Sequence, residues 1–481
     1  EEREHGLATI DAITRAGETA SKAVLFSGMT VVVSLLGMLI VPWNLMTSVG
    51  GAILVVLTSV VMTLTLLPAV LSLLGDRVNR GRIPFIGYRR ATTSTSSDSA
   101  SRFWTSISRL VMRRPVVSLI ASAGLLLILG SFTFSLHLGH GTLSNLPENS
   151  DSIQAVQIFE NEFPGADYQP ATIVVEADDV TTPAIQTAIN NLLATLDSDP
   201  AFGPATLATS ANHDLVRIDV ALKVDEEGNQ AIDAIKRLRG DYVPALFGST
   251  GASVHVTGET ASMIDIIDLA RTYLPIVVAF VLAISFLLLL VAFRSIIVPL
   301  KAITMNLLSV FASYGLLVLF FQKGVGADLL GFQQVDRIDA FVLLFLFCIL
   351  FGLSMDYHVF LLSRIKEQFD ITGDNEQAVT AGLRSTGKLI TSAALIMVGV
   401  FGGFAAADLA NLQQFGFGLA AAVFLDATVV RMVLVPASMA LLGNRNWYLP
   451  AWLNWLPTMH IEGTPAHLPA EQPVFEPVLA D

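Results

Sequence analysis

The sequence predicts a polytopic α-helical membrane protein with about eight transmembrane helices and one external α/β domain. Hydrophobic residues make up 53% of the 481 residues, and the mean hydropathy is +0.63. Only 14% of the residues are charged, whereas soluble domains carry about 25%. Apolar windows of about 20 residues, the length that crosses a bilayer, recur along the chain. One long segment between them, residues 137–272, is instead rich in acidic residues.

The apolar windows predict eight spans in two groups. We expect residues 1–22 to form a cytoplasmic amphipathic helix, followed in 23–74 by two spans that end a first repeat. One span lies before the acidic segment, and 273–442 contain five spans of a second repeat. The predicted spans are 23–42, 49–74, 115–136, 273–293, 296–321, 338–363, 388–407 and 415–442.

The positions of Lys and Arg predict the orientation, because short cytoplasmic loops carry an excess of both. The linker 75–114 carries nine Arg and only two acids, and the short segments 294–301 and 364–388 add two and four Lys or Arg residues. Loops 43–48 and 408–414, which fall on the opposite side, have no Lys or Arg. We therefore expect a multi-pass protein of the inner (plasma) membrane with both termini of this chain in the cytoplasm.

The segment 137–272 is expected to be an external folded domain. It holds 20 acidic and six basic residues, which accounts for the net charge of −13. Helical periodicity in "DSIQAVQIFENEF", "TPAIQTAINNLLATL" and "NQAIDAIKRLRGDYV" alternates with strand patterns in "ATIVVEA", "LVRIDVALKV" and "SVHVTGE". Strands separated by helices predict βαβ units and a ferredoxin-like sandwich. The tail, 443–481, is rich in Pro and acid towards its end and is expected to be mostly disordered.

An internal repeat relates the two groups of spans. Residues 12–37 align with 378–403, and "LLPAVLSLLGDR" aligns with "LVPASMALLGNR". Such repeats are typical of transporters built from two related halves. In the second copy the amphipathic helix follows a span, and the matching span is absent before residue 1. We therefore expect this chain to be the C-terminal portion of a longer protein, with the missing N-terminal half as its partner. The matched residues are Lys22 with Lys388, Gly37 with Gly403, Pro68 with Pro436 and Gly75 with Gly443.

Asp356 lies within the apolar span in "FGLSMDYHVFLLSRIKEQF". A charged Asp at the bilayer centre costs about 2.5–3.5 kcal/mol on insertion scales, a cost that protonation removes. An acid that alternates between the two forms can carry a proton, and Tyr357 supplies a neighbouring hydroxyl. Helical spacing puts Gly352, Asp356 and Ser363 on one small, polar face suited to contact with other helices. A structural alternative is a buried acid that only bonds to a neighbouring helix.

A second pair of charges occurs in "FLDATVVRMVLVP", where Asp426 precedes Arg431 by five residues. Five residues turn an α-helix by about 140°, so the two side chains are not expected to meet. We expect them to find partners on other helices, with Asp356 as the candidate partner of Arg431. The first copy of the repeat has Thr58 and Thr63 at the matching positions, which argues against a purely structural role for the charges.

Three further polar residues within spans are possible supporting groups. Lys301 can extend its ammonium group to the cytoplasmic surface, and we favour this interpretation over a relay role. Ser27 and Ser392, like Asn306, are of types that commonly bond neighbouring membrane helices.

The sequence offers no motif for an enzyme, a cofactor or a metal. It has no nucleotide-binding Gly-rich loop, no GxSxG and no clustered Cys and His. No extended basic face for nucleic acid occurs outside one short loop. Without an ATP site, pumping would have to use an ion gradient, so we expect a secondary active transporter.

These motifs together resemble the MMPL family (mycobacterial membrane protein large) of the resistance-nodulation-division (RND) superfamily. The resemblance rests on "FGLSMDYHVFLLSRIKE", "AFRSIIVPLKAITMNLLSVFASYGLL", "LDATVVRMVLVPA" and "VLFSGMTVVVSLLGMLIVP". It implies twelve spans, two porter domains and an Asp-Tyr pair on each of two central helices that carry protons. Here the pair is Asp356 and Tyr357, and Asp426 and Arg431 match the supporting charges. The resemblance implies proton-driven export of lipids or other hydrophobic compounds by a membrane protein that can be a homo-oligomer, and it leaves the substrate open.

Two other functions share this scaffold. A sterol-sensing or Patched-like protein would bind lipid to regulate another process without pumping. A protein-translocation accessory subunit of the same superfamily would have fewer spans in one unit. The two charge-bearing motifs favour proton coupling over both alternatives.

Overall fold

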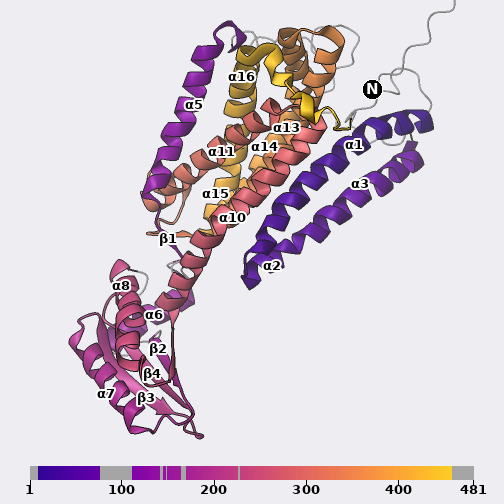
Figure 1. Cartoon of the computed structure of the whole chain (residues 1–481). Helices are drawn as coiled ribbons and strands as arrows, with labels where there is room; N and C mark the ends of the chain where they lie inside the picture. The colour runs from indigo at the N-terminus through magenta and orange to yellow at the C-terminus, as the bar shows by residue number, and fades with distance from the viewer. Residues whose placement is uncertain are drawn as a thin grey trace, which may run out of the picture.

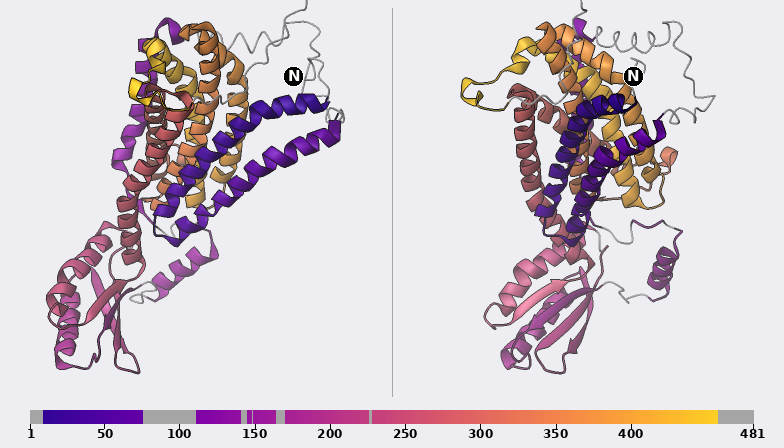
Figure 2. Two further views of the ribbon diagram at one scale, coloured as in Figure 1. Left: turned by 45° about the vertical axis from the view of Figure 1, so that its right-hand side comes forward. Right: turned by 90° about the vertical axis from the view of Figure 1, so that its right-hand side faces the viewer.

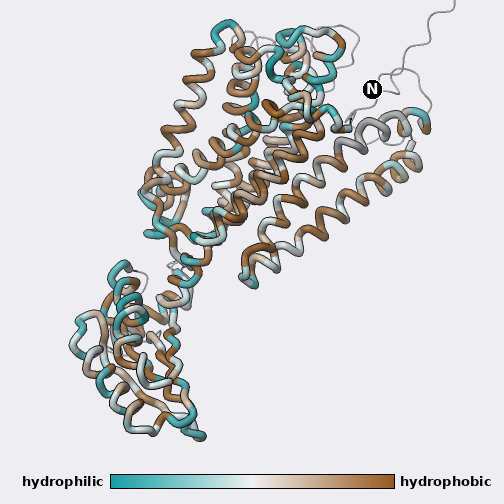
Figure 3. Tube along the Cα trace, viewed as in Figure 1, coloured by the Kyte–Doolittle hydropathy of each residue, from teal (hydrophilic) through white to brown (hydrophobic). Residues whose placement is uncertain are grey.

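The computed structural model describes residues 9–75, 111–140, 145–147, 149–163, 170–225 and 228–457. It shows a bundle of long helices with an α/β domain projecting from one end (Figure 1). The helices of the bundle are largely apolar along their length, whereas the projecting domain alternates between polar and apolar residues (Figure 3). This division agrees with the predicted apolar spans and the acid-rich α/β segment between them.

Seven helices in the described part of the chain are long and apolar enough to cross a membrane, which supports a multi-pass membrane protein. The predicted count of eight is one higher. The difference lies in the first predicted span, 23–42, where the apolar helical stretch is only Val24–Ile40 and so falls below the length of the others. The seven helical stretches are Asn44–Leu74, Pro115–Ser135, Glu259–Phe293, Ile297–Gln322, Ala340–Thr372, Asn375–Ala405 and Ala410–Trp447.

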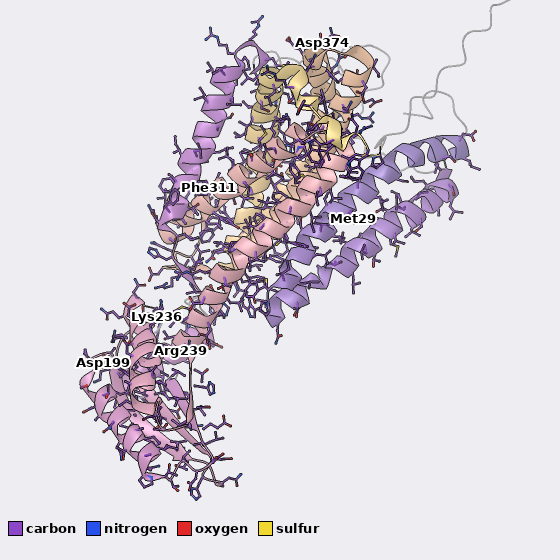
Figure 4. All side chains as sticks on the ribbon, in the orientation of Figure 1. Met29, Asp199, Lys236, Arg239, Phe311 and Asp374 are labelled. Carbon is purple, nitrogen blue, oxygen red and sulfur yellow. The ribbon has the colours of Figure 1, made fainter. Side chains whose placement is uncertain are left out.

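The chain begins with a helical hairpin that slants away from the bundle (Figures 1 and 2). Its long arms are α1 (Thr9–Leu36) and α3 (Ala52–Leu74), joined by the short helices η1 (Gly37–Ile40) and α2 (Asn44–Gly50). Helix α1 is continuous across the boundary predicted between residues 22 and 23; residues 1–8 lie outside the described residues. Met29, on the apolar part of α1, is labelled in Figure 4.

Helix α5 (Pro115–Ser131) follows the basic linker, of which residues 76–110 lie outside the described residues. It begins with Pro115 at its first turn, where the missing N–H costs nothing. Near its other end the backbone of Leu129 lies against Gly315 of α11, where a Cβ atom would overlap the Leu129 carbonyl oxygen. Gly130 lies against the ring of Phe311 (Figure 4). Glycine at both positions permits this close contact between membrane helices.

The α/β domain, which we call the external domain after its predicted position, contains a four-stranded antiparallel sheet in the order β3-β4-β2-β5. A helix separates β2 from β3, β3 and β4 are consecutive, and helices again separate β4 from β5. The element bounds are α6 (Asp151–Glu162), β2 (Ala171–Glu176), α7 (Pro183–Ser198), β3 (Phe202–Thr209), β4 (Leu215–Leu222), α8 (Asn229–Arg237), η4 (Leu238–Tyr242), α9 (Val243–Phe247) and β5 (Ser253–Thr257).

Strand β3 is absent from the sequence-based prediction. It is an edge strand that contains Gly203 and Pro204, and its register shifts between Phe202 and Ala205. Only Phe202 and Gly203 of this strand are buried. Pro, Gly and a bulge are features of edge strands, and they remove the alternation of apolar and polar residues by which a strand is recognised.

Helices α7, α8 and α9 cover one face of the sheet, whereas α6 stands apart from it (Figure 2). Ile173, Val175 and Ile218 are buried from the sheet, and they form one core with Leu192 of α7 and Ile235 of α8. On the open face Arg217 forms an ion pair with Asp219 at 2.9 Å, and Thr172 donates to the same carboxylate at 2.7 Å. The domain is therefore a two-layer α/β unit with one polar face.

Two connections join the external domain to the bundle. Helix α10 (Glu259–Phe293) leaves β5 through Gly258, whose φ of 117° favours glycine, and continues without a break along the bundle. The second connection is a short parallel pairing of β1 (Leu138–Gly139) with β6 (Ile338–Asp339). Beside it, Arg337 Nη2 donates to Asn229 Oδ1 at the start of α8, at 2.6 Å.

The rest of the bundle consists of helices before and after β6 in the chain. Asp339 caps α13 by accepting from the Phe341 amide at 2.9 Å, and Asp374 (Figure 4) caps α14 by accepting from the Glu376 amide at 2.8 Å. The helices are α11 (Ile297–Leu317), η5 (Val318–Gln322), α12 (Ala327–Leu330), α13 (Ala340–Thr372), α14 (Asn375–Ala405), α15 (Ala410–Leu425), η6 (Asp426–Leu434) and α16 (Val435–Leu442).

The glycines matched by the sequence repeat adopt the same conformation. Gly75 ends α3 with φ 48° and ψ −125°, and Gly443 ends α16 with φ 52° and ψ −132°. Residues with a side chain rarely adopt this region. The agreement supports the predicted relation between the two copies.

The start of the predicted tail is folded. Residues 443–457, which we call the C-terminal strap, contain the short helices η7 (Gly443–Trp447) and η8 (Ala451–Leu453). Asn446 is fully buried and donates to the backbone carbonyl oxygen of Met439 at 2.9 Å. Apolar and amide groups fix the strap to the bundle. The Pro-rich, acidic end of the tail, 458–481, lies outside the described part, so its expected disorder stays a prediction.

Candidate functional site

A cluster of polar side chains lies inside the bundle where α11, α13 and η6 meet. Arg431 and Asp426 of η6 form an ion pair, and their side chains are only 3% and 8% exposed. Ser354 of α13 and Asn306 of α11 complete the cluster. Desolvation makes an isolated charge very costly here, so each member of the pair depends on the other.

The pairing of Asp426 with Arg431 corrects the expectation that the two side chains point apart. Residues Asp426–Leu434 form a π-helix rather than an α-helix. The i→i+5 hydrogen bonding of a π-helix brings the fifth residue back over the first. Arg431 therefore meets Asp426 on its own helix, and α13 supplies further contacts to both residues.

Ser354 links the three helices. Its hydroxyl oxygen lies 2.8 Å from Asp426 Oδ2 and 2.7 Å from Asn306 Oδ1. One hydroxyl proton cannot serve both acceptors at once. The contacts are compatible if Ser354 donates to Asp426 and the Asn306 amide is turned so that its nitrogen donates to Ser354. Asp426 Oδ2 then accepts from both the Ser354 hydroxyl and Arg431 Nη2.

Arg431 also connects η6 to the Asp-Tyr motif of α13. Its Nη2 atom donates to the Ser354 carbonyl oxygen at 2.7 Å, and its Cζ atom lies 4.7 Å from the centre of the Tyr357 ring, a cation–π contact. The Tyr357 hydroxyl lies 3.5 Å from Met397 Sδ of α14. Asp356 precedes Tyr357 on the same helix, and its side chain lies outside the described part of the structure.

One face of α13 near the motif contacts another helix, as its small residues predict. A Cβ atom at Gly352 would lie 3.2 Å from the Ser34 side chain and from Val31 Cα, both on α1. Helix α13 is therefore in close contact with α1 one turn before Asp356.

A cavity of about 20 Å³ adjoins the cluster. This volume suffices for one water molecule. Among the described residues, Asp426 Oδ1 and Arg431 Nε have no hydrogen-bond partner although both are buried. The two carboxylate oxygens of Asp426 therefore differ, because Oδ2 is hydrogen-bonded and Oδ1 is not. The residues that line the cavity include Asn306, Ser354, Tyr357, Asp426 and Arg431, together with apolar residues of α13, α14 and α15.

Of the three possible supporting residues, Lys301 and Ser392 do not join the cluster. Lys301 Nζ donates to Asn446 Oδ1 of the C-terminal strap at 3.1 Å, so it has a specific protein partner as well as a position near the helix end. Ser392 is exposed and donates to the Leu389 carbonyl oxygen of its own helix at 2.9 Å. Ser27 lies on α1, and its side chain falls outside what the structure describes.

Sequence reasoning missed two residues of α13. Ser354 precedes Tyr357 by three residues and His358 by four, so helical spacing puts all three near one face. His358 is 1% exposed, and neither ring nitrogen has a partner among the described residues. The available signal was their spacing, since two polar side chains one turn apart occur within an otherwise apolar stretch.

The described residues contain no group of three or more His, Cys, Asp or Glu that could hold a metal ion. The described side chains of the site are an acid, a guanidinium, two neutral hydrogen-bonding groups and a phenol. Such a set can stabilise or transfer a proton.

Comparison with known proteins was made on the sequence and on the fold. The sequence model of the MMPL family matches residues 1–118 and 144–462. The mycolic acid-containing lipids exporter MmpL11 of Mycolicibacterium smegmatis is 36% identical over 450 residues, which cover 92% of this chain and 46% of that protein. The trehalose monomycolate exporter MmpL3 of Mycobacterium tuberculosis is 32% identical over 504 residues, covering 98% of this chain and 52% of that protein. The chain thus spans about half the length of these relatives.

A solved structure has a similar fold. The hedgehog release protein Disp from the water bear Hypsibius dujardini superposes with a TM-score of 0.62 over 88% of this chain and 58% of that one, at 15% identity. At this identity the likeness concerns the fold alone.

Proposed function

Because the chain belongs to the MMPL family, we propose that it takes part in proton-motive-force-driven export of lipids or other hydrophobic molecules across the inner membrane. The buried Asp426–Arg431 pair, bonded to Ser354 on the helix that carries Asp356 and Tyr357, is the observation that carries this proposal. A desolvated ion pair is a poor way to stabilise a bundle, since apolar side chains of similar size often stabilise it more. The presence of the ion pair inside the bundle therefore favours a functional role over a purely structural one.

We assign the proton-carrying step to Asp356. In this assignment a proton binds the Asp356 carboxylate and removes its charge, and release of the proton restores the charge. Tyr357 offers the nearest hydroxyl, and the Arg431 guanidinium, fixed by Asp426 and the Ser354 carbonyl, provides a stationary positive charge. The gradient supplies about 2.3 kcal/mol per 100 mV and about 1.36 kcal/mol per pH unit.

We also propose that the α/β domain is an external, ferredoxin-like porter domain on the substrate path. Its order β2-α7-β3-β4-α8-β5 and the antiparallel strand order β3-β4-β2-β5 support this assignment, because the ferredoxin-like fold interleaves two βαβ units in this way. The excess of acidic residues in the segment and the basic linker near α5 support an orientation with both termini of the chain in the cytoplasm.

The names of the relatives support a lipid as the substrate, since two of them are exporters of mycolic acid-containing lipids and of trehalose monomycolate. We propose the same broad class here, with a hydrophobic tail and a polar head. Because those relatives are about twice as long as this chain, we also propose that transport requires a partner segment that completes the bundle beside α13.

The decisive experiment replaces Asp356 in a transport-competent protein reconstituted in vesicles with an imposed pH gradient. Asp356→Asn keeps the size of a protonated Asp but cannot bind and release a proton, so we expect lipid-dependent proton flux to disappear. Tyr357→Phe should reduce the flux less, because it removes one hydroxyl. Size-exclusion profile, thermal stability and lipid binding should stay near those of the parent. Normal flux in a well-folded Asp356→Asn variant would contradict the proton-carrying role and favour a lipid-binding regulator.

The partner requirement has a separate test. We expect the 481-residue chain alone to show little lipid-dependent proton flux in the same vesicles. Full flux from this chain alone would overturn the partner proposal while leaving the role of Asp356 to be judged by its own variant.

A further inference from the structure

The C-terminal strap bonds to the corner where α10 turns into α11. The Ile296 amide donates to the Tyr448 carbonyl oxygen at 3.2 Å, and Ser295 Oγ donates to the Asn446 carbonyl oxygen at 2.6 Å. Arg294 Nη2 donates to the Asn454 carbonyl oxygen at 3.1 Å. The strap is thus fixed at several points to a turn between two membrane helices.

The end of the strap has two opposite faces. Leu453 and Leu456 are 5% and 7% exposed, whereas Trp452 and Trp455 are 71% and 75% exposed. The spacing of three residues is that of the 3₁₀ geometry in η8, which aligns residues i and i+3. The sequence "WLNWLP" therefore turns both leucines towards the protein and both tryptophans away from it.

The contacts of Leu453 and Leu456 with α10 show where the strap lies along the bundle axis. Leu453 and Leu456 form a small core with Leu290 of α10, and Phe286 and Val291 pack against it. Phe286 lies seven residues before the end of α10 at Phe293, or about 10 Å along the axis. The strap therefore overlaps the last turns of a membrane-spanning helix, and Figure 2 (right) shows it projecting outward beside that end of α10.

The charge of this region suits a phospholipid surface. Arg445 is exposed and Arg294 is partly exposed, while the strap contains no acidic residue. Lys366 lies over the Trp447 ring at 5.2 Å. Cationic groups beside aromatic rings are typical of the boundary between the acyl chains and the head groups, where Trp and Tyr are enriched.

We propose that the C-terminal strap is an interfacial anchor that inserts Trp452 and Trp455 between the lipid head groups and acyl chains at this end of the bundle. Exposed indole rings, an apolar inner face at the height of the last helical turns and the nearby arginines carry this inference. The anchor fixes the depth of the α10–α11 turn in the membrane, and its partner is the phospholipid surface rather than another protein. It does not rest on the proposed transport activity.

The test compares tryptophan fluorescence of the parent chain with that of W452F/W455F in phosphatidylcholine–phosphatidylglycerol vesicles. The quenchers are lipids brominated near the carbonyl end of the acyl chain, lipids brominated near the methyl end, and acrylamide in water. We expect carbonyl-end bromine to quench most strongly. The quenched signal should fall by roughly half in W452F/W455F, since interfacial indoles lie beside that end of the acyl chain.

The matched control is W447F, because Trp447 stacks on Phe369 with ring centres 5.5 Å apart and is partly buried. This variant should leave the bromolipid-quenched signal nearly unchanged. Strong acrylamide quenching that W452F/W455F abolishes would place the indoles in water and overturn the proposal. Resistance of both indoles to every quencher would point to a protein partner and would overturn it as well. A single-substitution pair, W452F and W455F made separately, gives the same reading if the double variant misfolds.

Discussion

Helix α3 closes the first copy of the repeat, and η6 with α16 closes the second. Both end in a glycine with nearly the same backbone angles, Gly75 and Gly443. Their surroundings differ: α3 has no buried residue, whereas Asp426 and Arg431 lie inside the bundle. Their geometry differs as well, because α3 stays α-helical while Asp426–Leu434 is a π-helix.

The threonines of the first copy explain why the same scaffold tolerates both versions. Thr58 and Thr63, at the positions of Asp426 and Arg431, each donate to a carbonyl oxygen of their own helix at 2.7 Å. They need no partner from another helix. Asp426 and Arg431 do need one, because a charge in the membrane interior is tolerated only where other groups surround it. Burial by neighbouring helices, rather than the repeat itself, decides where the charges can lie.

The largest expected effect comes from breaking the ion pair. Arg431→Ala leaves Asp426 buried without its guanidinium and should lower the free energy of unfolding by about 3–5 kcal/mol. The matched change in the first copy, Thr63→Ala, removes only a local bond and should stay within about 0.5 kcal/mol. Chaotrope unfolding of the purified chain in detergent micelles measures both values. Equal losses in the free energy of unfolding for the two variants would show that the buried charges of the second copy do not depend on each other more than the threonines of the first copy do.

Replacing either of the two matched glycines should cause a smaller loss of stability, of similar size in both copies. Gly75→Ala and Gly443→Ala should each cost about 1–2 kcal/mol, because an L side chain disfavours positive φ. An added Cβ would meet no atom within 4 Å at either position, so the cost arises from the backbone alone. The same unfolding measurement applies.

Gly124→Ala in α5 is the control for this pair. An added Cβ at Gly124 also meets no atom within 4 Å, but the residue lies inside a helix. Alanine there should stabilise the protein by up to about 1 kcal/mol. A stabilising effect at Gly75 or Gly443 would show that the two caps do not require glycine.

An Arg–Asp pair in the external domain shows how much burial in the bundle increases the stability cost of breaking an ion pair. Asp199 (Figure 4) accepts from Arg237 Nη2 at 2.8 Å and from the Tyr242 hydroxyl at 2.9 Å. Because the Arg237 side chain is 41% exposed, Arg237→Ala should cost only about 1 kcal/mol. Amide hydrogen exchange of β2 and β4 reports this loss locally. A loss of stability as large as that of Arg431→Ala would mean that burial in the bundle does not increase the cost of breaking an ion pair.

The same pair predicts an acid dependence, which is the smallest effect. Burial alone would raise the pKa of Asp199, but hydrogen bonds from Arg237, the Ala201 amide and Tyr242 outweigh it and lower the pKa. The stabilisation is therefore present above the unfolded-state pKa of about 3.9 and is lost as the pH falls through the lower folded-state pKa. Asp199→Asn should flatten the exchange profile in that acidic range, and an unchanged profile would contradict the assignment.

The apolar windows predicted the membrane helices well, because a span is defined by length and hydropathy alone. The pairing of Asp426 with Arg431 could not be predicted in this way, because nothing in the residue types indicates a π-helix. The rotation per residue of an α-helix therefore predicted that the two side chains point apart. Strand β3 was missed because Gly203 and Pro204 obscure its pattern. Ser354 was not singled out because its role depends on which helices lie opposite α13.

The contact of β1 with β6 has a mechanical consequence. Helix α10 joins the external domain to the bundle as a stiff rod, while β6 leads directly into α13 and pairs with the strand that leads towards the domain. The domain is thus held at two points, one on the rod and one at the head of the helix that carries Asp356. The β1–β6 pairing and the Arg337–Asn229 bond both lie at the start of α13. If α13 moved along its axis relative to α10, these contacts would pull on one side of the domain while α10 held the other. A displacement within the membrane would then become a tilt of the domain outside it.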